Sequence, residues 1–384
     1  MIYFDNAATT WPKPPEVKEA MVRFMDEIGA NPGRSGHLLS IEAARILYEA
    51  RETLSKLFNV KDPSRIIFTL NATESINLAL KGLLRSGDHV LTSSMEHNSV
   101  MRPLRDLEKR GVELTLVPCS SKGELDPEDM KKRIQPNTKI IVLNHASNVT
   151  GTILPVREVG KIARNHQILF LVDAAQTAGA YPIDMENDKI DLLAFTGHKS
   201  LYGPQGTGGL VIGGNVNIQD LTPLKQGGTG SRSEFEEQPD FLPDRYESGT
   251  PNAVGIAGLL AGVQSVLKRG VSQIHQGEIA LIENLVRGLE EIPSVKIYGP
   301  PKGRDRMATL SFNISSLSPS DVASRLENGF GILCRPGLHC APSAHRTLGT
   351  FPEGTVRLSL GCFNTREEVH HAIEAIHHLS KGNR

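Results

Sequence analysis

Residues 169–176 have the sequence LFLVDAAQ, and this stretch decides the fold. Four apolar residues stand before Asp173, and a short apolar run bounded in this way is typical of a buried strand. Residues 156–165, just before it, have apolar positions three and four apart, which predicts a helix. A second apolar run follows at 192–195. Strands that alternate with helices favour a mainly parallel sheet covered on both faces, so the predicted fold class is α/β.

The same alternation extends in both directions from this stretch. Residues 75–84 have helical periodicity. Further short apolar runs predict strands at 66–68, 90–91, 114–116, 140–143 and 209–212. The pattern breaks up between about residues 214 and 250, where the Gly-rich, polar segment 226–233 predicts a long functional loop.

The C-terminal third has a pattern of its own. Helical periodicity resumes at Val254 and runs to about Leu289, with a break near Gly270. Beyond it, strands are predicted at 295–298, 307–313, 330–334 and 355–360, and helices at 319–328 and 365–380. A chain of 384 residues is long enough for two or three domains. We therefore predict a large domain over 15–270 and a smaller α+β domain over 271–384.

Composition and charge exclude several classes of protein. The chain has 42 Lys and Arg against 43 Asp and Glu, a formal net charge of −1, which offers no electrostatic basis for binding nucleic acid or an anionic membrane. No run approaches the roughly eighteen apolar residues of a membrane helix, and the N-terminus lacks the pattern of a signal peptide. The cysteines number 4, too few for a disulfide scaffold. We therefore expect a cytoplasmic protein with neither nucleic acid nor membrane as partner.

Two residues point to cofactor chemistry. Lys199 directly follows a predicted buried strand, in FTGHKS at 195–200, and its amine is suited to forming a Schiff base with an aldehyde cofactor. Asp173 ends the strand at 169–172, where open α/β sheets bind ligands, and such a carboxylate can keep a pyridine nitrogen protonated. Alone, the lysine would be read as a surface turn and the aspartate as a helix cap. Together, 26 residues and one strand apart, they favour a pyridoxal phosphate site.

Two further segments fit the same site. NATES, at 71–75, joins a strand to a helix, where backbone N–H groups and a hydroxyl bind phosphate well, although it also makes a plain N-cap. His97, in MEHN at 95–98, can lie flat against a planar ring, although a hydrogen-bonded histidine is the more common explanation for such a residue alone.

Together these residues resemble the cysteine desulfurase branch of the class V aminotransferases, which are fold-type I enzymes that use pyridoxal 5'-phosphate (PLP). The resemblance covers essentially the whole chain and begins with YFDNAATT at 3–10. It implies a large domain with a mainly parallel seven-stranded sheet and a smaller α+β C-terminal domain. It also implies that residues 1–14 form an N-terminal arm that packs with the small domain.

The resemblance implies a role for each residue of the cofactor site. Lys199 would form the Schiff base with PLP, Asp173 would pair with the pyridine nitrogen, and His97 would stack on the ring as a catalytic residue. Gln176 would contact the phenolic oxygen, and Asn148 would contact both cofactor and substrate. The positions that match the phosphate site are Ala72, Thr73, Thr196, His198 and, reaching into the neighbouring subunit, Thr250. The last of these implies a homodimer with shared active sites, and no metal site is expected.

The segment CRPGLHCAP, at 334–342, resembles the Arg-x-Gly-x-His-Cys-Ala box of the group II desulfurases, which include selenocysteine lyases. Cys340 falls on the nucleophile position. Most cysteines are buried and inert, but Cys340 stands in a Gly- and Pro-bearing loop beside His339 and Arg335, and positive groups favour the thiolate. The other three cysteines are predicted to have packing roles: Cys119, Cys334 and Cys362.

Arg357, in TVRLS at 355–359, matches the arginine that binds the substrate α-carboxylate, a task that suits its planar fork. Arg335 is predicted to bind substrate as well. Arg357 follows Cys340 by 17 residues, a short spacing as in group II members, so we expect a sulfur-acceptor protein to dock close to the site. Pro336 and Leu338 depart from the best-known group II enzymes, and 343–350 is similar to a loop of a less characterised subfamily.

The resemblance implies a PLP-dependent cysteine desulfurase. It would convert L-cysteine to L-alanine, leave the sulfane sulfur on Cys340 as a persulfide, and pass it to an acceptor. Three alternatives stay open. They are a lyase for L-selenocysteine, a class V aminotransferase for another small amino acid, and a non-catalytic paralogue, which would be expected to lack Lys199 or Asp173. The pathway, whether iron–sulfur cluster assembly, tRNA thiolation or selenium recycling, is not encoded in any motif.

Overall fold

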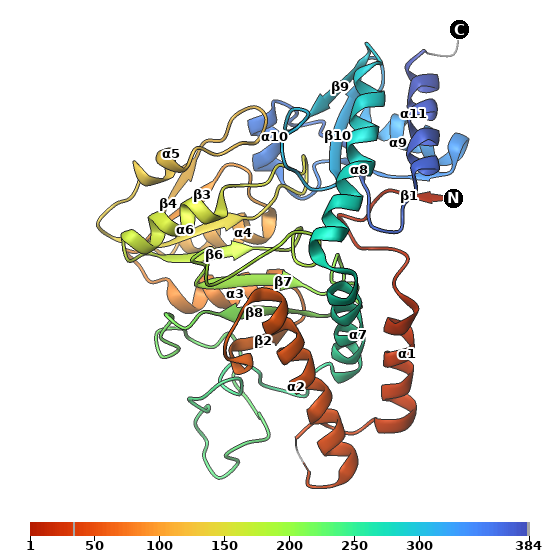
Figure 1. Ribbon diagram of the computed structural model, residues 1–384. Coiled ribbons are helices and arrows are strands. Elements are labelled where there is room, and N and C mark those ends of the chain that lie inside the picture. Colours follow the sequence, from red (N-terminus) through yellow and green to blue (C-terminus); the bar gives the residue numbers. More distant parts are fainter. Residues whose placement is uncertain (34, 382–384) are drawn as a thin grey trace.

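A computed structural model describes residues 1–33 and 35–381 of the chain. Its centre is a seven-stranded sheet with the order β2-β8-β7-β6-β5-β3-β4 (Figure 1). The strands are β2 (Ile66–Thr69), β3 (His89–Ser93), β4 (Glu113–Val117), β5 (Thr138–Asn144), β6 (Leu169–Asp173), β7 (Leu192–Thr196) and β8 (Gly208–Ile212). The pairs that join β4, β3, β5, β6 and β7 are parallel, and β8 is antiparallel to both its neighbours. The predicted α/β class and mainly parallel sheet are confirmed.

Helices cover both faces of this sheet, because successive side chains of each strand point to opposite sides. In β6, Phe170 and Val172 belong to one apolar cluster, whereas Leu171 belongs to another. The first cluster contains side chains of α2 (Leu38–Phe58), α5 (Pro127–Lys131), α6 (Val156–Asn165) and α7 (Ala253–Arg269). The second contains those of α3 (Ala72–Leu83) and α4 (Asn98–Glu108). The central strands are therefore buried on both sides, as their near-continuous apolar sequences predict.

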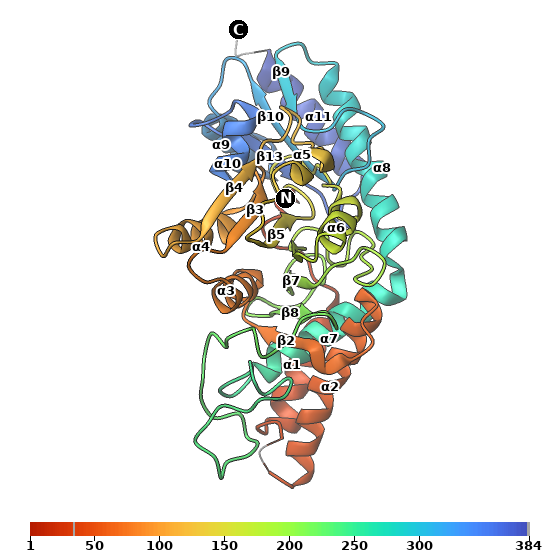
Figure 2. The same cartoon turned by 90° about the vertical axis from the view of Figure 1, so that its left-hand side faces the viewer.

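A helical layer lies below the sheet in Figures 1 and 2. It consists of α1 (Pro15–Arg23), the single π-helical turn η1 (Phe24–Ile28), α2 and α7, and a short 3₁₀ turn, η2 (Pro63–Arg65), connects α2 to β2. Apolar side chains of η1, α2 and α7 form a cluster of their own. The segment between β8 and α7 contains no helix or strand, as predicted, and both views show it extending beside α2.

The C-terminal part contains an antiparallel sheet of four strands in the order β12-β13-β10-β9. The strands are β9 (Val295–Tyr298), β10 (Thr309–Ile314), β12 (Arg335–Gly337) and β13 (Thr355–Ser359). The helices of this part are α8 (Val271–Glu290), α9 (Pro319–Phe330), α10 (Pro342–Leu348) and α11 (Arg366–Ser380). Strand β12 and helix α10 were not predicted, because Arg-Pro-Gly has no apolar pattern and gains its strand conformation from pairing with β13.

The N-terminal segment packs against this C-terminal part. Strand β1 (Ile2–Tyr3) pairs in parallel with β11 (Ile332–Leu333), so the strand predicted at 330–334 is shorter and belongs to a separate two-stranded sheet. Phe4 is fully buried in the apolar cluster of the C-terminal part. Gly270 separates α7 from α8. The division into an arm, a large domain and a small domain at residues 14 and 270 stays a prediction.

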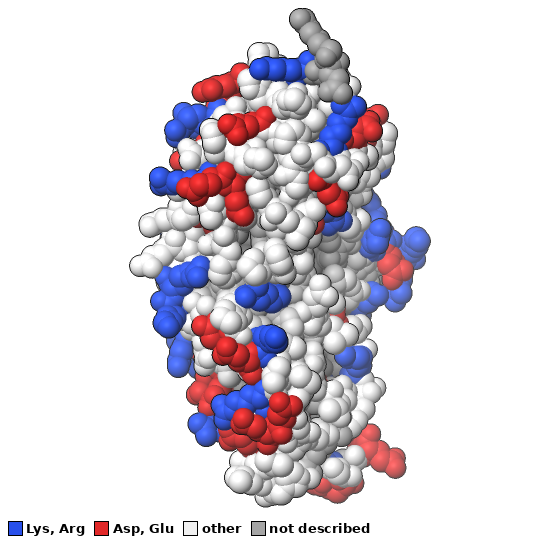
Figure 3. Space-filling model, turned by 90° about the vertical axis from the view of Figure 1, so that its right-hand side faces the viewer, with Lys and Arg blue, Asp and Glu red and all other residues white. Residues whose placement is uncertain are grey.

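The molecular surface carries charges of both signs. On the face in Figure 3, Lys and Arg side chains lie beside Asp and Glu side chains in several clusters, with large uncharged areas between them. Among the described residues, no single helix is long and apolar enough to cross a membrane. Helices α7 and α8 pass that test only as a pair bent by 78°, and many of their apolar side chains are buried inside the protein.

Candidate active site

A pocket of about 220 Å³ lies at the carboxyl ends of the parallel strands β3, β5, β6 and β7. The C-terminal part closes it with side chains from β12 and β13. Most residues that the sequence singled out line this one pocket: Ala72, Thr73, His97, Asn148, Asp173, Gln176, Thr196, His198, Lys199, Arg335 and Arg357. Parallel strands bring these residues together because their carboxyl ends share one edge of the sheet.

Lys199 and Asp173 form the charged centre of the pocket. Asp173 is 6% exposed, and its Oδ1 accepts a hydrogen bond of 2.9 Å from the Ala175 N–H. Burial lowers the pKa of Lys199 from 10.5 to about 8, the nearby Asp173 carboxylate opposes this shift, and the guanidinium of Arg357 adds to it. Burial also raises the pKa of Asp173. Near neutral pH, a larger share of the Lys199 amine is therefore neutral and nucleophilic than of an ordinary lysine.

His97 is the N-cap residue of α4. Its Nδ1 accepts a hydrogen bond of 3.1 Å from the Ser99 N–H, so the ring proton lies on Nε2. Burial, together with the charge of Lys199, lowers the pKa of His97 to about 3. The imidazole is therefore neutral, and α4 holds its orientation.

The N-terminus of α3 lies at one end of the pocket. Asn71 caps the helix through Oδ1, which accepts from the Glu74 N–H at 3.0 Å. The N–H groups of the first helical turn have no acceptor within the helix, and they carry the positive end of the helix dipole. Thr73 Oγ1 lies 2.8 Å from Ser99 Oγ at the same end. This arrangement is suited to binding a phosphate group.

Several buried polar atoms around the pocket lack a hydrogen-bond partner within the described residues. They are Thr196 Oγ1, Asn144 Oδ1, Asn148 Oδ1 and Arg357 Nε. Buried polar groups are normally satisfied, because leaving one unpaired costs free energy. Four such atoms at one pocket indicate that the site is shaped to bind a polar ligand.

The two arginines of the pocket face each other across a strand pair. Arg335 of β12 and Arg357 of β13 are directly paired residues, so their side chains leave the sheet on the same face. Two positive charges so placed repel each other, and Asp5 offsets this repulsion with a carboxylate 2.6 Å from Arg357 Nη2. Arg357 Nη1 donates to the Asn148 carbonyl oxygen at 3.0 Å. The arrangement forms a positive, buried site that suits a carboxylate ligand.

Cys340 is exposed, as predicted. It lies in the short connection between β12 and α10, and its Sγ lies 3.5 Å from Arg335 Nη2. Cys340 does not line the pocket itself, but Arg335 lines the pocket and contacts the thiol, so the thiol stands at the rim.

The other three cysteines differ from Cys340 in their surroundings. Burial raises the pKa of Cys119 to about 11 and that of Cys334 to about 12. Burial also raises the pKa of Cys362, whose Sγ accepts from the Tyr202 hydroxyl at 2.8 Å. These three thiols therefore stay protonated at neutral pH, and they pack against apolar clusters.

Known proteins are similar to this chain over most of its length. The family described as Aminotransferase class-V matches residues 2–371. The chain belongs to the class V aminotransferase family. A probable cysteine desulfurase of Methanothermobacter thermautotrophicus is 36% identical over 373 residues, covering 96% of this chain and 92% of the relative. A cysteine desulfurase of Salmonella dublin is 32% identical over 384 residues, covering 98% and 92%.

A solved structure has the same fold as this class V chain. The apo structure of a cysteine desulfurase from Thermococcus onnurineus NA1 superimposes with a TM-score of 0.92 at 36% identity, covering 100% of this chain and 95% of that one. The predicted fold-type I architecture and the predicted membership of the cysteine desulfurase branch are thus confirmed.

Thr250 is the one cofactor residue predicted from the class V resemblance that lies away from the pocket. It is exposed, and it lines a separate depression with Phe68, Gly206 and Glu247. Its hydroxyl accepts from Asn31 Nδ2 at 3.4 Å. The fold therefore does not bring Thr250 to the site of its own chain.

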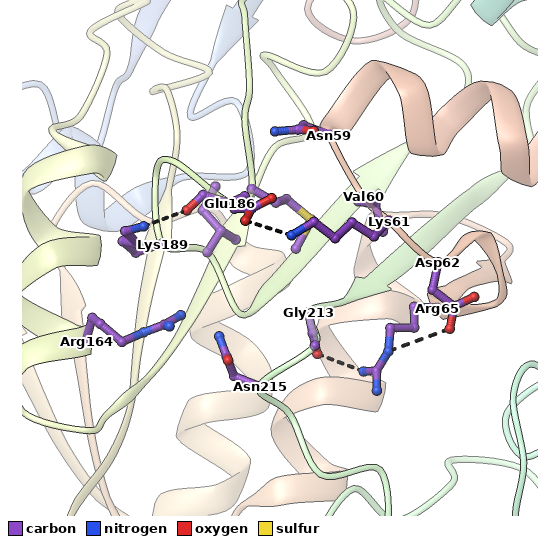
Figure 4. Close-up of a pocket in the computed structure, with 13 residues that line it drawn as sticks. Asn59, Val60, Lys61, Asp62, Arg65, Arg164, Glu186, Lys189, Gly213 and Asn215 are labelled. Carbon is purple, nitrogen blue, oxygen red and sulfur yellow. Dashed lines mark hydrogen bonds and ion pairs between the residues drawn. The ribbon is translucent and has the colours of Figure 1, made fainter.

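Another pocket, of about 350 Å³, lies away from the carboxyl ends of the strands (Figure 4). In Figure 4, Lys61 and Glu186 form an ion pair, and Arg65 donates to the Gly213 carbonyl. The basic side chains of this pocket are thus largely paired with acceptors of the protein. None of the predicted site residues lines it. In the described part of the chain, no cluster of His, Cys, Asp and Glu is arranged to hold a metal ion.

Three residues that matter to this class V site were not predicted from the sequence. Asn144 ends β5 beside Asp173, and extending the strand prediction by one residue would have found it. Asp5 lies within YFDNAATT, but no local pattern connects it with Arg357. His345 is fully buried below the Cys340 loop, and nothing in the sequence marks it as a partner of His339.

Proposed function

We propose that this protein is a PLP-dependent cysteine desulfurase that converts L-cysteine to L-alanine and holds the released sulfur on Cys340 as a persulfide. The observation that carries the proposal is the position of Arg335. Its guanidinium lines the pocket that contains Lys199 and Asp173, and it also lies 3.5 Å from Cys340 Sγ. An aminotransferase has no use for a thiol at this place.

The pocket fits PLP in its unpaired polar atoms and its charges. Thr196 Oγ1 is a buried hydroxyl without a partner, and the N-terminus of α3 attracts phosphate. Lys199 would hold the aldehyde carbon, Asp173 the pyridine nitrogen, and His97 the face of the ring. The remaining residues proposed to hold the cofactor are Ala72, Thr73, Asn148, Gln176, Thr196 and His198. When bound, PLP supplies an electron sink that stabilises negative charge at the substrate Cα.

Arg357 is proposed to bind the α-carboxylate of L-cysteine. It is 1% exposed, and a buried guanidinium forms strong, directional pairs with carboxylates. Arg335 adds a second positive charge on the same face, and Asn148 contributes an unpaired amide oxygen. The three side chains together orient the amino acid before its bonds break.

Lys199 Nζ then takes the proton from the substrate Cα, a task for which its lowered pKa is suited. The Cys340 thiolate attacks the substrate sulfur, and the bond between that sulfur and Cβ breaks. The sulfur stays on Cys340 as a persulfide, and Cβ is protonated to give the methyl group of alanine. A thiol of an acceptor protein takes the sulfane sulfur in the last step.

The acceptor has to approach Cys340 closely. The carbonyl oxygen of Cys340 accepts from the Asn98 N–H at 2.8 Å, so the loop is tied to the start of α4. A loop held in this way cannot carry the sulfur far from the pocket. We propose an acceptor protein that serves iron–sulfur cluster assembly, and a cytoplasmic location that keeps all four thiols free.

A homodimer with shared sites is proposed from the exposed apolar surface. Leu38, Ile41 and Tyr48 are exposed on one side of α2, three and seven positions apart, and Met25 of η1 is exposed as well. Burying such side chains against a second copy would stabilise the dimer. Thr250 would then reach the phosphate in the neighbouring subunit.

The function is tested by product analysis with the PLP-loaded protein. L-Cysteine is supplied with excess dithiothreitol to measure alanine and sulfide, and without dithiothreitol to measure the mass of the Cys340 peptide. We expect alanine from the wild type and a gain of one sulfur atom on Cys340, and neither from Cys340→Ala. Cys362→Ala is the matched control and should behave as the wild type. Equal alanine formation by Cys340→Ala and the wild type would contradict the persulfide step.

The same assay separates the alternatives. Turnover that depends on an added 2-oxo acid would indicate an aminotransferase. A selenocysteine lyase would prefer L-selenocysteine, and it would retain that activity in Cys340→Ala because selenium leaves more readily than sulfur.

The dimer is tested by sedimentation. Ile41→Glu places a charge in the apolar surface of α2, so we expect it to dissociate the dimer and weaken PLP binding. Lys56→Glu changes an exposed position of the same helix and should leave the dimer intact. A monomeric wild type at micromolar concentration would refute the dimer without affecting the proposed reaction.

A further inference from the structure

A chain of three side chains runs from the end of α10 to the backbone of β12. Thr350 Oγ1 lies 2.7 Å from His345 Nδ1, and His345 Nε2 lies 3.3 Å from His339 Nδ1. His339 Nε2 lies 2.9 Å from the Arg335 carbonyl oxygen. Both histidines are buried, with 2% and 0% of their surfaces exposed. None of the steps proposed above uses His345 or Thr350.

The donor and the acceptor of each hydrogen bond follow from the groups at the two ends of this chain of side chains. A carbonyl oxygen only accepts, so His339 Nε2 carries a proton and donates to Arg335. Burial lowers the pKa of His339 to about 2 and that of His345 to about 4, so each ring is neutral and has one N–H. His339 Nδ1 therefore accepts from His345 Nε2, and His345 Nδ1 accepts from the Thr350 hydroxyl. Every donor in the chain has one partner.

The segment that this chain supports is strained. His339 and Cys340 have φ angles of 49° and 57°, in the left-handed region that residues with a Cβ atom rarely adopt. Two hydrogen bonds from the segments that follow β3 and β5 hold the backbone at these residues. Asn148 Nδ2 donates to the His339 carbonyl oxygen at 2.7 Å, and the Asn98 N–H donates to that of Cys340 at 2.8 Å. Among the described residues, the hydrogen bonds of the His339 ring go to Arg335 and His345.

We propose that His345 is a positioning residue for the Cys340 thiol. Its Nε2–H fixes the His339 ring, the ring fixes the backbone of Arg335, and the Cys340 Sγ is thereby held 3.5 Å from the Arg335 guanidinium. His345 does not line the pocket, so it acts through His339 and not on the substrate. The inference rests on the proposed function, in which Cys340 receives the sulfur.

Two substitutions test this role in the PLP-loaded enzyme. His345→Gln keeps an N–H of similar reach for His339 Nδ1, whereas His345→Leu has a similar volume and no donor. With L-cysteine and excess dithiothreitol, we expect His345→Leu to lower kcat for alanine about ten- to a hundredfold, as misplacement of a reacting group does. KM and the absorption of bound PLP should stay at wild-type values. His345→Gln should stay within about threefold of the wild type. Wild-type kcat in His345→Leu, or an equal loss in both variants, would overturn the proposal.

A second measurement does not depend on turnover. The rate at which iodoacetamide alkylates Cys340 in the PLP-loaded protein, followed by mass spectrometry, reports the setting of the thiol. We expect a changed rate in His345→Leu and a wild-type rate in His345→Gln, whereas equal rates in all three proteins would overturn the positioning role. If the wild type forms no alanine, the proposed function fails, and the alkylation rates still decide the role of His345.

Thr350→Val is the replacement variant if His345→Leu does not fold. It removes only the hydroxyl that sets the tautomer of His345. We expect about a threefold loss of kcat, the effect of one hydrogen bond. An unchanged kcat and alkylation rate in this variant would contradict the positioning role of the hydrogen-bonded chain from Thr350 to His339.

Discussion

Arg357 Nη2 and Asp5 Oδ1 form an ion pair of 2.6 Å, although 352 positions separate the two residues in the sequence. Arg357 is 1% exposed, and its Nη1 is bound to the Asn148 carbonyl oxygen. The guanidinium is therefore oriented before a substrate enters. In the proposed function, the substrate carboxylate shares this positive charge with Asp5, so we expect Asp5 to influence substrate affinity.

The first prediction concerns this pair. Arg357→Lys removes the planar fork, so we expect KM for L-cysteine to rise about tenfold or more while kcat changes less. Asp5→Asn keeps an oxygen for Arg357 and removes the competing charge, so KM should fall about threefold. Steady-state kinetics of alanine formation measure both effects. A rise of KM in Asp5→Asn as large as in Arg357→Lys would show that Asp5 serves mainly to orient the arginine.

The second prediction concerns the close approach of β8 to the cap of α3. A Cβ atom on Gly208 would lie 2.7 Å from Asn71 Cα and 2.8 Å from the Phe195 carbonyl oxygen, so the cap would have to move. We expect Gly208→Ala to weaken PLP binding about tenfold, measured by absorbance titration of the apo protein. Gly214→Ala is the control, because nothing lies within 4 Å of its Cβ position. Equal affinities of the two variants would contradict the role of the α3 terminus.

The third prediction concerns the pH dependence of PLP uptake. Only a neutral amine reacts with an aldehyde, and the pKa of Lys199 is lowered to about 8. The rate of uptake by the apo protein should rise with pH with a midpoint about 8, and not at the ordinary lysine value of 10.5. Asp173→Asn removes a charge that raises this pKa, so the midpoint should move down. Stopped-flow absorbance measures the rates, and a midpoint near 10.5 would contradict the buried setting.

The fourth prediction concerns Glu278 of α8, a carboxyl that is 5% exposed. Burial raises its pKa from 4.5 to about 8. Between these pH values the folded state binds more protons than the unfolded state, so the stability that this group contributes is lost as pH rises. The free energy of unfolding of the wild type relative to Glu278→Gln should fall by about 1.4 kcal/mol per pH unit in this range.

Urea unfolding at pH 5 and pH 7.5 measures this difference for Glu278→Gln. Glu290→Gln, at an exposed position near the end of the same helix, is the matched control. A difference between wild type and Glu278→Gln that is the same at both pH values would show that the Glu278 side chain is hydrated in solution.

Much of the fold and the cofactor site could be predicted from local sequence. Apolar runs located the strands of the large sheet to within about two residues, because both faces of a central strand are buried. Lys199 and Asp173 could be paired because Lys199 comes three residues after the end of β7 and Asp173 ends β6, and neighbouring parallel strands end at the same edge. Both inferences use only spacing along the chain.

The side chains that surround the Cys340 thiol could not be predicted in this way. Strand β12 places Arg335 opposite Arg357, an arrangement of like charges that pairing rules disfavour in isolation. Asp5, which pairs with Arg357, comes from the other end of the chain. The β-bridge between Asp5 and Ser359 holds it beside β13. Helix α10 was not predicted, because its segment has no apolar periodicity. The contact between His345 and His339 could therefore not be predicted either.

The sequence by itself determined the fold class and the membership of the desulfurase branch, and it led to the proposed cofactor residues, since these follow from periodicity and from motifs that are contiguous in the chain. Only the tertiary structure decided how Asp5 neutralises Arg357, how His345 supports the Cys340 loop and why Thr250 lies outside the pocket of its own chain. The physical reason is that ion pairs, buried hydrogen bonds and strand register join residues far apart in sequence, and their strength depends on burial and distance that the folded chain alone creates.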